Sequence, residues 1–479
     1  MEHVDVLIVG AGLSGVGAAC QLRERVPGAS IAIVESRGAI GGTWDLFRYP
    51  GVRSDSDMFT LGYSFRPWRA AAVLADGSSI REYIRETARE YGVDRLVRFN
   101  HRVTAAAWDS DTARWTVTLD RGGETVEMTC GFLFSCTGYY RYDEGHTPDF
   151  PGREDFAGPV VHPQHWPQDL DWTGKRVAVI GSGATAVTLV PALAEKAEHV
   201  TMVQRSPSYV VSLGSRDPLA DFLRKVLPDR VAHPAVRWKN ALAATALFRF
   251  SRWRPDVIRR LIRWDAKRRL PEGYPVDVHF RPRYDPWDQR MCFVPDADLF
   301  RVIGSGRASV VTDAVTGFTP TGLALESGAT VDADIVVTAT GLSVLPFGGI
   351  QLTVDGTKID FGDTVAYKGM MLSGVPNLAV AIGYTNASWT LKCDLVAAYV
   401  CRLLNHMRAN GLRRVMPLAP DPSLPTEPFI DLKANYVLRA LDQLPRQGPT
   451  TPWRLHQNYP KDVVLLRHGP VDDAGVEFA

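Results

Sequence analysis

The sequence lacks several features that would assign a function directly. Its six cysteines form no CxxC pair and no cluster of metal-like spacing, which argues against a disulfide reductase and against a metal site. No G-x-S-x-G elbow and no HExxH motif is present, so serine-hydrolase and zinc-protease chemistry find no support. Lysine and arginine number 54 against 53 acidic residues, a balance that gives no field attracting nucleic acid.

Long apolar runs and a leader pattern are also missing. Glycine or charge interrupts every apolar stretch before the roughly 18 residues that a spanning helix needs. A strand, VDVLIVG, begins almost at the N-terminus and leaves no room for a charged leader. With 45% hydrophobic and 22% charged residues among 479, the chain is expected to form two or three domains of a cytoplasmic protein with reduced, mostly buried thiols.

A first nucleotide-binding unit opens the chain. Residues 4–9 have the apolar character of a buried parallel strand. In the turn that follows, Gly10 permits the tight bend, Gly12 lets the backbone approach a pyrophosphate, and Gly15 lets helix and strand pack closely. The next strand ends at Glu35, whose carboxylate can accept hydrogen bonds from ribose hydroxyls and would repel a 2′-phosphate. This unit predicts FAD or NAD rather than NADP.

A second unit of the same kind begins at KRVAVIGSGATA. Gly181, Gly183 and Ala186 repeat the glycine spacing, and another strand, HVTMVQR, follows. No acid stands at the end of that strand, where Arg205 is found instead. A guanidinium can pair bidentately with a 2′-phosphate, which predicts NADPH, although Arg205 could also be an ordinary surface arginine.

These patterns predict an α/β protein with two dinucleotide-binding, Rossmann-like domains. Residues 1–140 form the first part of the FAD-binding domain, and 141–170, rich in proline, histidine and aspartate, form a linker. The NADP-binding domain at 171–330 is inserted in the first, which resumes over 331–479 at the strand DIVVTATGL.

A basic helical insert is expected at about 210–280, within the second domain. Residues 224–269 contain fourteen lysines and arginines against three aspartates, with Trp238, Trp253 and Trp264 among them. Helical spacing favours a subdomain with a solvated basic face. A lid over the pocket, or a surface that rests on anionic lipid, is the alternative.

Two longer motifs resemble a known family. The fixed positions of F-x-G-x3-H-x3-W-P are filled by Phe156, Gly158, His162, Trp166 and Pro167. Those of G-G-x-W-x4-Y-P-G-x3-D are filled by Gly41, Gly42, Trp44, Tyr49, Pro50, Gly51 and Asp55. Both patterns resemble the type I Baeyer–Villiger monooxygenases, which are class B flavin monooxygenases. DPWDQRM and GYTNASWTLK are similar to the branch that includes the ethionamide-activating monooxygenase.

The resemblance implies a specific chemistry. FAD reduced by NADPH reacts with O2 to give a C4a-peroxyflavin, which attacks a ketone and forms a tetrahedral Criegee-type adduct that becomes an ester or lactone. Sulfides can also be oxidised. By this resemblance Arg290 stabilises the peroxyanion and then the adduct, because a guanidinium stays charged and offers a fork of donors. Asp55 holds that arginine in place.

Further site residues follow from the same resemblance. Gly42, Thr43, Trp44 and Tyr49 are expected around the flavin or its approach, and Tyr384 and Asn386 in a late segment that contacts it. His162 belongs to the interdomain linker, so a positional role is expected rather than proton transfer. Trp166 and Pro167 would stiffen the same linker.

Two other functions stay open at this point. An N- or S-oxygenating flavin monooxygenase would use the same two nucleotide units on a soft heteroatom. A non-catalytic flavin-binding redox or membrane adaptor would be built around the basic insert. The expected partners are a small-molecule ketone or sulfide and O2, without nucleic acid, and membrane contact through 224–269 is the less favoured possibility.

Overall fold

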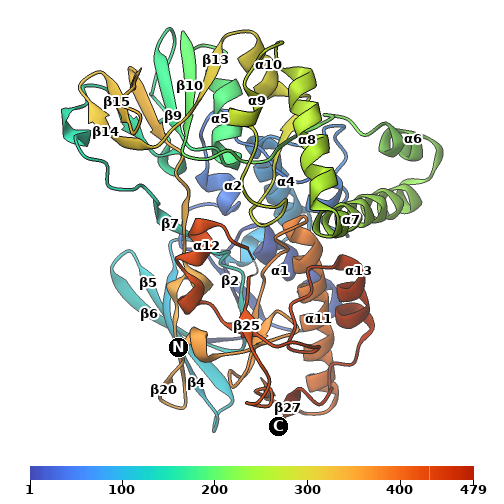
Figure 1. The fold of residues 1–479 in the computed structure, drawn as a ribbon. Coiled ribbons are helices and arrows are strands. Elements are labelled where there is room, and N and C mark those ends of the chain that lie inside the picture. Colours follow the sequence, from blue (N-terminus) through green and yellow to red (C-terminus); the bar gives the residue numbers. More distant parts are fainter. Residues whose placement is uncertain (431) are drawn as a thin grey trace.

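Two sheets form the two halves of the computed structural model, which describes residues 1–430 and 432–479 (Figure 1). Among these residues the larger sheet has nine strands in the order β20-β19-β4-β5-β6-β1-β2-β3, with β23 also paired to β6. Their bounds are β1 Glu2–Val9, β2 Ile31–Val34, β3 Val97–Arg98, β4 Arg102–Asp109, β5 Arg114–Arg121, β6 Glu124–Ser135, β19 Gln351–Val354, β20 Thr357–Lys358 and β23 Leu378–Val380.

The parallel part of this sheet holds the first nucleotide unit. Strand β1 pairs in parallel with β2 and β6, and all three are largely buried, as their apolar sequences require. Helices α1 (Leu13–Arg25) and α11 (Trp389–Ala409) pack against each other over it, and α4 (Gly77–Glu90) lies beside α1. Residues from both ends of the chain therefore share one core, which confirms that the first domain is discontinuous.

The smaller sheet is parallel throughout, in the order β13-β10-β9-β17-β8. Its bounds are β8 Val160–Val161, β9 Arg176–Ile180, β10 His199–Gln204, β13 Ala308–Thr312 and β17 Ile335–Thr338, with α5 at Ala184–Leu193 and α10 at Asp298–Gly304. A three-stranded sheet, β14 Val315–Thr319, β15 Gly322–Leu325 and β16 Thr330–Asp332, stands next to it.

The position of β17 corrects the domain boundary predicted at residue 330. This strand, DIVVTATGL in the sequence, pairs with β9 and β8 of the smaller sheet, so the second domain continues to Thr338. The predicted linker likewise contributes β8 to that sheet. An apolar strand of four residues carries no mark of the sheet that it joins, and register is settled only by its neighbours.

Two connections between the halves run side by side. Strand β7 (Tyr140–Gly145) leaves the first domain, and β18 (Leu342–Val344) returns to it, and the two pair antiparallel. The C-terminal region then folds over the larger sheet with α12 Asn435–Leu438, α13 Tyr459–Asp462 and a π-helix at Val463–His468. Short pairs there are β21 Ala366–Tyr367 with β22 Met371–Leu372, β24 Val415–Pro417 with β27 Val476–Phe478, and β25 Glu427–Pro428 with β26 Arg446–Gln447.

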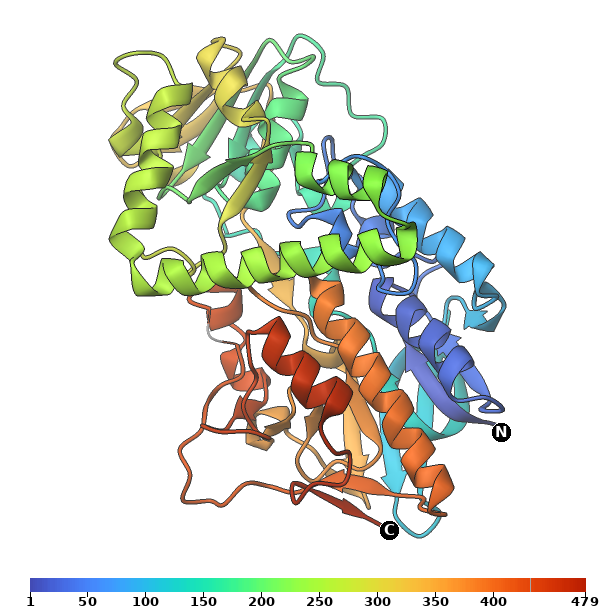
Figure 2. The same cartoon turned by 90° about the vertical axis from the view of Figure 1, so that its right-hand side faces the viewer.

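The basic insert is helical, as the sequence predicts. It consists of α6 Pro218–Val226, α7 Asp229–Trp253, α8 Pro255–Arg269 and α9 Val276–His279, between the paired strands β11 Val210–Leu213 and β12 Cys292–Pro295. Figure 2 shows α7 running horizontally across the front of the molecule, between the upper and the lower half. No helix in the described part of the chain is both long enough and apolar enough to traverse a bilayer.

Helix α7 is fixed to the first domain by a buried arginine. Arg237 donates to the carbonyl oxygens of Phe59, Thr60 and Gly62, at 2.6 to 3.2 Å, and pairs with Asp394 of α11 at 3.0 Å. Both members of the ion pair are about 5% exposed or less. Helix α7 therefore belongs to the second domain by sequence and packs on the first, whereas α8 and α9 pack on the second.

Candidate active site

The first glycine turn brings strand, helix and a later loop into close contact. Gly10 has φ +105°, which favours glycine, and a Cβ at Gly15 would lie 1.9 Å from the Gly10 carbonyl oxygen. Gly12 caps α1, and a Cβ at Gly42 would lie 2.9 Å from its Cα. These contacts leave the N-terminus of α1 open to a cavity, where its dipole favours an anionic group.

Glu35 stands at the end of β2, where the sequence places it. Its side chain is buried, and its Oε2 and Oε1 accept hydrogen bonds from the backbone nitrogens of Ala11 and Arg37, at 2.8 and 2.9 Å. The carboxylate is thereby fixed at the cavity wall with lone pairs left to accept from a ribose. This geometry fits the adenosine part of FAD.

The second unit has the same construction. Gly181 has φ +138° and lies against the Ala339 carbonyl oxygen, Gly183 caps α5, and Ala186 is buried in the first turn of that helix. Arg205 follows β10 and is exposed at the cavity wall. Within the described residues no ion pair holds its guanidinium, so the group is available to a phosphate.

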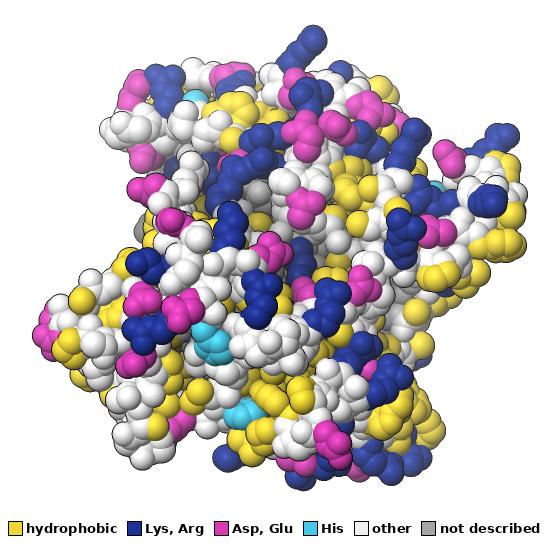
Figure 3. Space-filling model, turned by 90° about the horizontal axis from the view of Figure 1, so that it is seen from above, with side chains coloured by type: hydrophobic (Ala, Val, Ile, Leu, Met, Phe, Trp, Pro, Cys, Tyr) yellow, Lys and Arg dark blue, Asp and Glu magenta, His cyan; other side chains and the backbone are white. Residues whose placement is uncertain are grey.

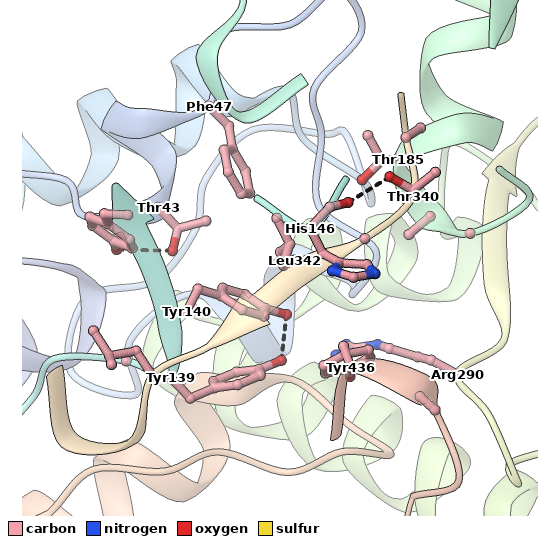
Figure 4. A pocket seen from close by; sticks show the side chains of 18 of the residues that line it. Thr43, Phe47, Tyr139, Tyr140, His146, Thr185, Arg290, Thr340, Leu342 and Tyr436 are labelled. Atoms are coloured by element: carbon pink, nitrogen blue, oxygen red, sulfur yellow. Dashed lines mark hydrogen bonds between the residues drawn. The ribbon is translucent and has the colours of Figure 1, made fainter. Parts of the chain in front are cut away.

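Both units open into one cavity of about 1110 Å³. This volume exceeds the roughly 300–1,000 Å³ of sites for a single small ligand, so the space suits two nucleotides. The cavity has walls from both halves, and Arg290, Tyr139 and Tyr436 also line it (Figure 4).

Arg290 and Asp55, which are 235 residues apart, meet in this cavity. The guanidinium Nε and Nη2 lie 3.0 and 3.2 Å from the two carboxylate oxygens, a bidentate arrangement. The cavity leaves 30% of the Arg290 side chain and 33% of the Asp55 side chain open to it. The carboxylate raises the pKa of Arg290 above its ordinary value, so the arginine is charged at any working pH.

Three tyrosines surround the pair. The hydroxyls of Tyr139 and Tyr140 point toward each other at 2.5 Å, and Tyr436 lies near Arg290 (Figure 4). The ring of Tyr139 stacks on Trp389, with centroids 5.0 Å apart. Burial raises the pKa of all three phenols, so they remain neutral donors and acceptors around the guanidinium.

A small apolar cavity lies on the other side of Arg290. Arg290, Tyr139, Tyr384, Trp389 and Tyr436 line both cavities. The rest of the small cavity is mostly aliphatic and aromatic, with walls formed by Pro346, Phe347, Ile382, Ile430, Leu432, Val437, Leu444 and Leu455. The guanidinium therefore borders both the large cavity, into which the two nucleotide units open, and the small apolar one.

The motif at 41–55 also joins the two halves. Thr43 Oγ1 lies 3.2 Å from the Tyr142 hydroxyl, and Trp44 packs on the core of the first domain, both at the cavity wall. Tyr49 lines the cavity too but packs in the core of the second domain. Arg53 pairs with Asp298 of α10 at 2.6 Å. The run thus fixes the domain contact beside the site.

The linker motif is structural in its contacts. Phe156 is buried against Phe318, and a Cβ at Gly158 would lie 2.1 Å from the Asp334 carbonyl oxygen. Trp166 packs edge-on against Trp172, with exposed Pro167 behind it.

His162 makes its contacts at the pair of interdomain connections. Its Nδ1 accepts from the Gln164 backbone nitrogen, and its Nε2 donates to the Gly341 carbonyl oxygen at 3.1 Å. Both ring nitrogens are therefore occupied, and burial lowers the pKa of the ring. This geometry supports the expected positional role and leaves no free nitrogen for proton transfer.

Of the two residues expected to contact the flavin from the segment after β23, Tyr384 lines the cavity and Asn386 does not. Tyr384 lines both cavities, while its hydroxyl donates to Asp462 at 2.6 Å, and Asp462 also pairs with buried Lys392. Asn386 does not line either cavity, and its amide donates to the Gln457 carbonyl oxygen. Its side chain thus holds the segment in place.

The sequence reading did not single out the tyrosines around Arg290. Tyr139 and Tyr140 follow the carboxyl end of β6, and ligands of doubly wound sheets bind at that edge, so their position was a usable signal. Tyr436 lies far along the chain in the short helix α12, and no motif in the neighbouring sequence indicates a role at the site.

Comparison with known proteins gives the family. A model described as flavin-binding monooxygenase-like matches residues 70–227, and one for an NAD(P)-binding Rossmann-like domain matches 8–71. The FAD-containing monooxygenase EthA of Mycobacterium tuberculosis is 55% identical over 479 residues, covering 100% of this chain and 98% of EthA. The chain belongs to the FAD-containing monooxygenases. The probable FAD-binding monooxygenase AlmA of Acinetobacter baylyi is 46% identical, over 100% of this chain and 96% of AlmA.

Solved structures share the fold at lower identity. A polycyclic ketone monooxygenase from Thermothelomyces thermophila superposes with a TM-score of 0.78 at 17% identity, over 100% of this chain and 90% of that one. An open cyclohexanone monooxygenase gives 0.76 at 20% identity, with all of both chains covered. The predicted fold class is confirmed, as is the prediction of an NADPH-dependent flavin monooxygenase, and FAD and NADPH agree with this family.

Proposed function

We propose that this FAD-containing monooxygenase oxidises ketones to esters or lactones with NADPH and O2. The observation that carries the proposal is the bidentate Arg290–Asp55 pair at the junction of the two cavities. One cavity has the room and the glycine turns for two nucleotides. The other has apolar walls but a volume of only about 30 Å³, so it would have to widen to admit a hydrocarbon skeleton. The guanidinium is where the two meet.

The cofactors fit the residues that line the large cavity. Gly10, Gly12 and Gly15 with the N-terminus of α1 would hold the FAD pyrophosphate, and Glu35 its ribose. Gly181, Gly183 and Arg205 would hold NADPH, with the guanidinium on the 2′-phosphate. Bound FAD, once reduced, supplies the activation of O2.

The task left to the protein is electrostatic. Arg290 places a permanent positive charge where negative charge develops during oxygen insertion, and a positioned donor of this kind is worth about 3–4 kcal/mol of barrier. Asp55 fixes the rotamer of the guanidinium through both carboxylate oxygens. The buried tyrosines and the apolar walls exclude water, which protects a reactive oxidant from wasteful decay.

The test is Arg290→Ala with product and cofactor measured in parallel. We expect ester formation from a model ketone to fall about 100-fold or more, because one oxyanion donor accounts for that much. NADPH consumption, followed at 340 nm, should continue in part and yield hydrogen peroxide. Arg176→Ala is the matched control, since Arg176 pairs with Asp334 outside the cavity. Ester formation at near-parent rate in Arg290→Ala would refute the assignment.

N- or S-oxygenation is the second candidate, because the same fold and cofactors serve it. The charged pair decides between them. Attack on a ketone needs an anionic oxidant held by Arg290, whereas oxidation of a sulfide does not. Sulfide oxidation that persists in Arg290→Ala while ester formation is lost would show that only the reaction with ketones depends on Arg290. The third alternative, a non-catalytic flavin-binding adaptor, is not favoured, because the relatives of this chain are monooxygenases.

A further inference from the structure

Exposed apolar side chains are concentrated on the basic insert. Of the seventeen large apolar side chains that are exposed in the described residues, ten lie between residues 219 and 264. That segment is about a tenth of the chain. Scattered exposed leucines are normal, but a concentration of this kind marks a surface that contacts something apolar.

On α6 these side chains form one stripe. Leu219, Phe222 and Val226 are 52–59% exposed and recur at intervals of three and four residues. The opposite side of the same helix packs inward through Ala220 and Leu223. The helix is therefore apolar on both sides, and among the described residues only its inner side has packing partners.

Helices α7 and α8 continue the surface. Leu242, Phe250 and Trp253 are exposed on α7, and Leu261 and Trp264 on α8. Trp253 and Trp264 are 72% and 58% exposed. Figure 2 shows α6, α7 and α8 on one side of the molecule, and Figure 3 shows apolar side chains next to lysines and arginines along the edge where α6 lies.

The charge of this surface is opposite to that of the rest of the chain. Residues 224–269 carry fourteen basic and three acidic side chains, a net of +11. Five of the basic side chains pair with aspartates outside this segment, which leaves a net of +6 for the segment together with these partners; they are Arg237, Lys239, Arg252, Arg259 and Arg263. The remainder carries 40 basic and 50 acidic side chains, a net of −10, which together give the +1 of the whole chain. A surface that alternates tryptophan and leucine with lysine and arginine matches the boundary between lipid head groups and acyl chains.

We propose that the outer face of α6, α7 and α8 rests on an anionic lipid bilayer. The apolar side chains would enter the head-group region, where tryptophan is favoured, while the basic side chains neutralise lipid phosphates. From the sequence alone, contact with lipid was less favoured than a solvated basic face. The exposure of the apolar side chains reverses that preference.

A second copy of the chain fits this face less well. Two copies that met through the same face would each bring a net positive charge, +6 once these ion pairs are counted, and that repulsion opposes a symmetric dimer. A contact with the acidic remainder of another copy would be head-to-tail, and unless the rotation between copies closed it into a ring it would build an open chain of molecules. A lipid surface satisfies both the charge and the apolar stripe without either problem.

Vesicle flotation of the FAD-loaded protein tests the proposal. The probes are vesicles of phosphatidylcholine alone and vesicles in which phosphatidylglycerol is mixed with it. We expect the protein to float with the anionic vesicles, to stay largely unbound with the neutral ones, and to be released as salt is raised, because salt screens the charges.

Two triple variants separate the contributions. Phe222→Ser, Trp253→Ser and Trp264→Ser should lower partitioning about 10-fold or more, and Arg249→Gln, Arg260→Gln and Lys267→Gln should do so mainly at low salt. Leu424→Ser with Leu438→Ser, two exposed leucines outside the insert, is the matched control and should float as the parent does. The charge variant and the salt series decide the matter if the apolar variant folds poorly.

Failure of the parent to float with anionic vesicles would overturn the proposal. So would flotation that neither triple variant reduces. A dimer that the apolar substitutions dissociate, in a parent that does not float, would assign the face to a second copy instead.

Discussion

Replacing Asp55 by asparagine isolates the positioning of Arg290. In the structure each carboxylate oxygen takes one donor of the guanidinium, at 3.0 and 3.2 Å. Asparagine keeps one acceptor and the same shape but presents an amide to the other donor and removes the negative charge. The guanidinium is then free to rotate toward the open third of its surface.

The cost follows from that freedom. A misplacement of about 1 Å lowers an oriented reaction about 100-fold, and the retained contact should recover part of this. We therefore expect ester formation in Asp55→Asn to fall about 10- to 100-fold, with Asp55→Ala at the upper end. NADPH oxidation should fall much less, so the ratio of ester to NADPH consumed is the decisive number.

The assay is gas-chromatographic analysis of the ester beside absorbance at 340 nm on the same sample. Asp298→Asn is the matched control, since it breaks the Arg53 pair at the domain contact without touching Arg290. Ester formation within about twofold of the parent in Asp55→Asn would refute the reasoning. Equal loss of ester formation and NADPH oxidation would do the same, because it would point to cofactor binding.

Three further outcomes are expected. Arg205→Ala should raise the KM for NADPH about 10- to 100-fold and leave the KM for NADH unchanged, because only the contact with the 2′-phosphate is lost. An equal rise in both KM values would refute the assignment of Arg205 to that phosphate. Lys392→Met should lower the free energy of unfolding in urea by about 3–5 kcal/mol, because Asp462 stays buried without its partner. Adding Asp462→Leu should restore part of that loss. If the losses of the two single variants simply add in the double variant, the ion pair is not the cause. Burial, then the nearby Arg237, lowers the pKa of His233 from 6.5 to about 4, so the unfolded chain binds the proton first and stability is lost as pH falls through that window. His233→Gln should remove about 1–2 kcal/mol of this loss, since the ring is partly open to solvent, and thermal melts across the window would show it.

Much of the nucleotide-binding plan could be predicted because local chemistry dictates it. The first turn requires glycine for two local reasons. The chain bends tightly at Gly10, and the backbone of Gly42 approaches Gly12 closely. Glu35 and Arg205 stand at strand ends, a place that the strand pattern itself defines.

Other parts depend on distant neighbours and could not be predicted locally. Strand β17 was assigned to the wrong sheet because four apolar residues fit either one. Tyr436 reaches Arg290 only through the path of the whole C-terminal region. Arg290 and Asp55 came from a family resemblance, since nothing within seven residues of either points to the other.

Helix α7 limits how the two halves can move relative to each other. It is continuous in sequence with the second domain, yet Arg237 ties it to α11 of the first. Pulling the helix away would strand a guanidinium and a carboxylate in the interior, at a cost of about 3–5 kcal/mol. If the second domain rotates relative to the first, the chain must therefore bend near the ends of the insert, where β11 and α8 contact the second domain. Helix α7 would then stay with the first domain while the second domain moves.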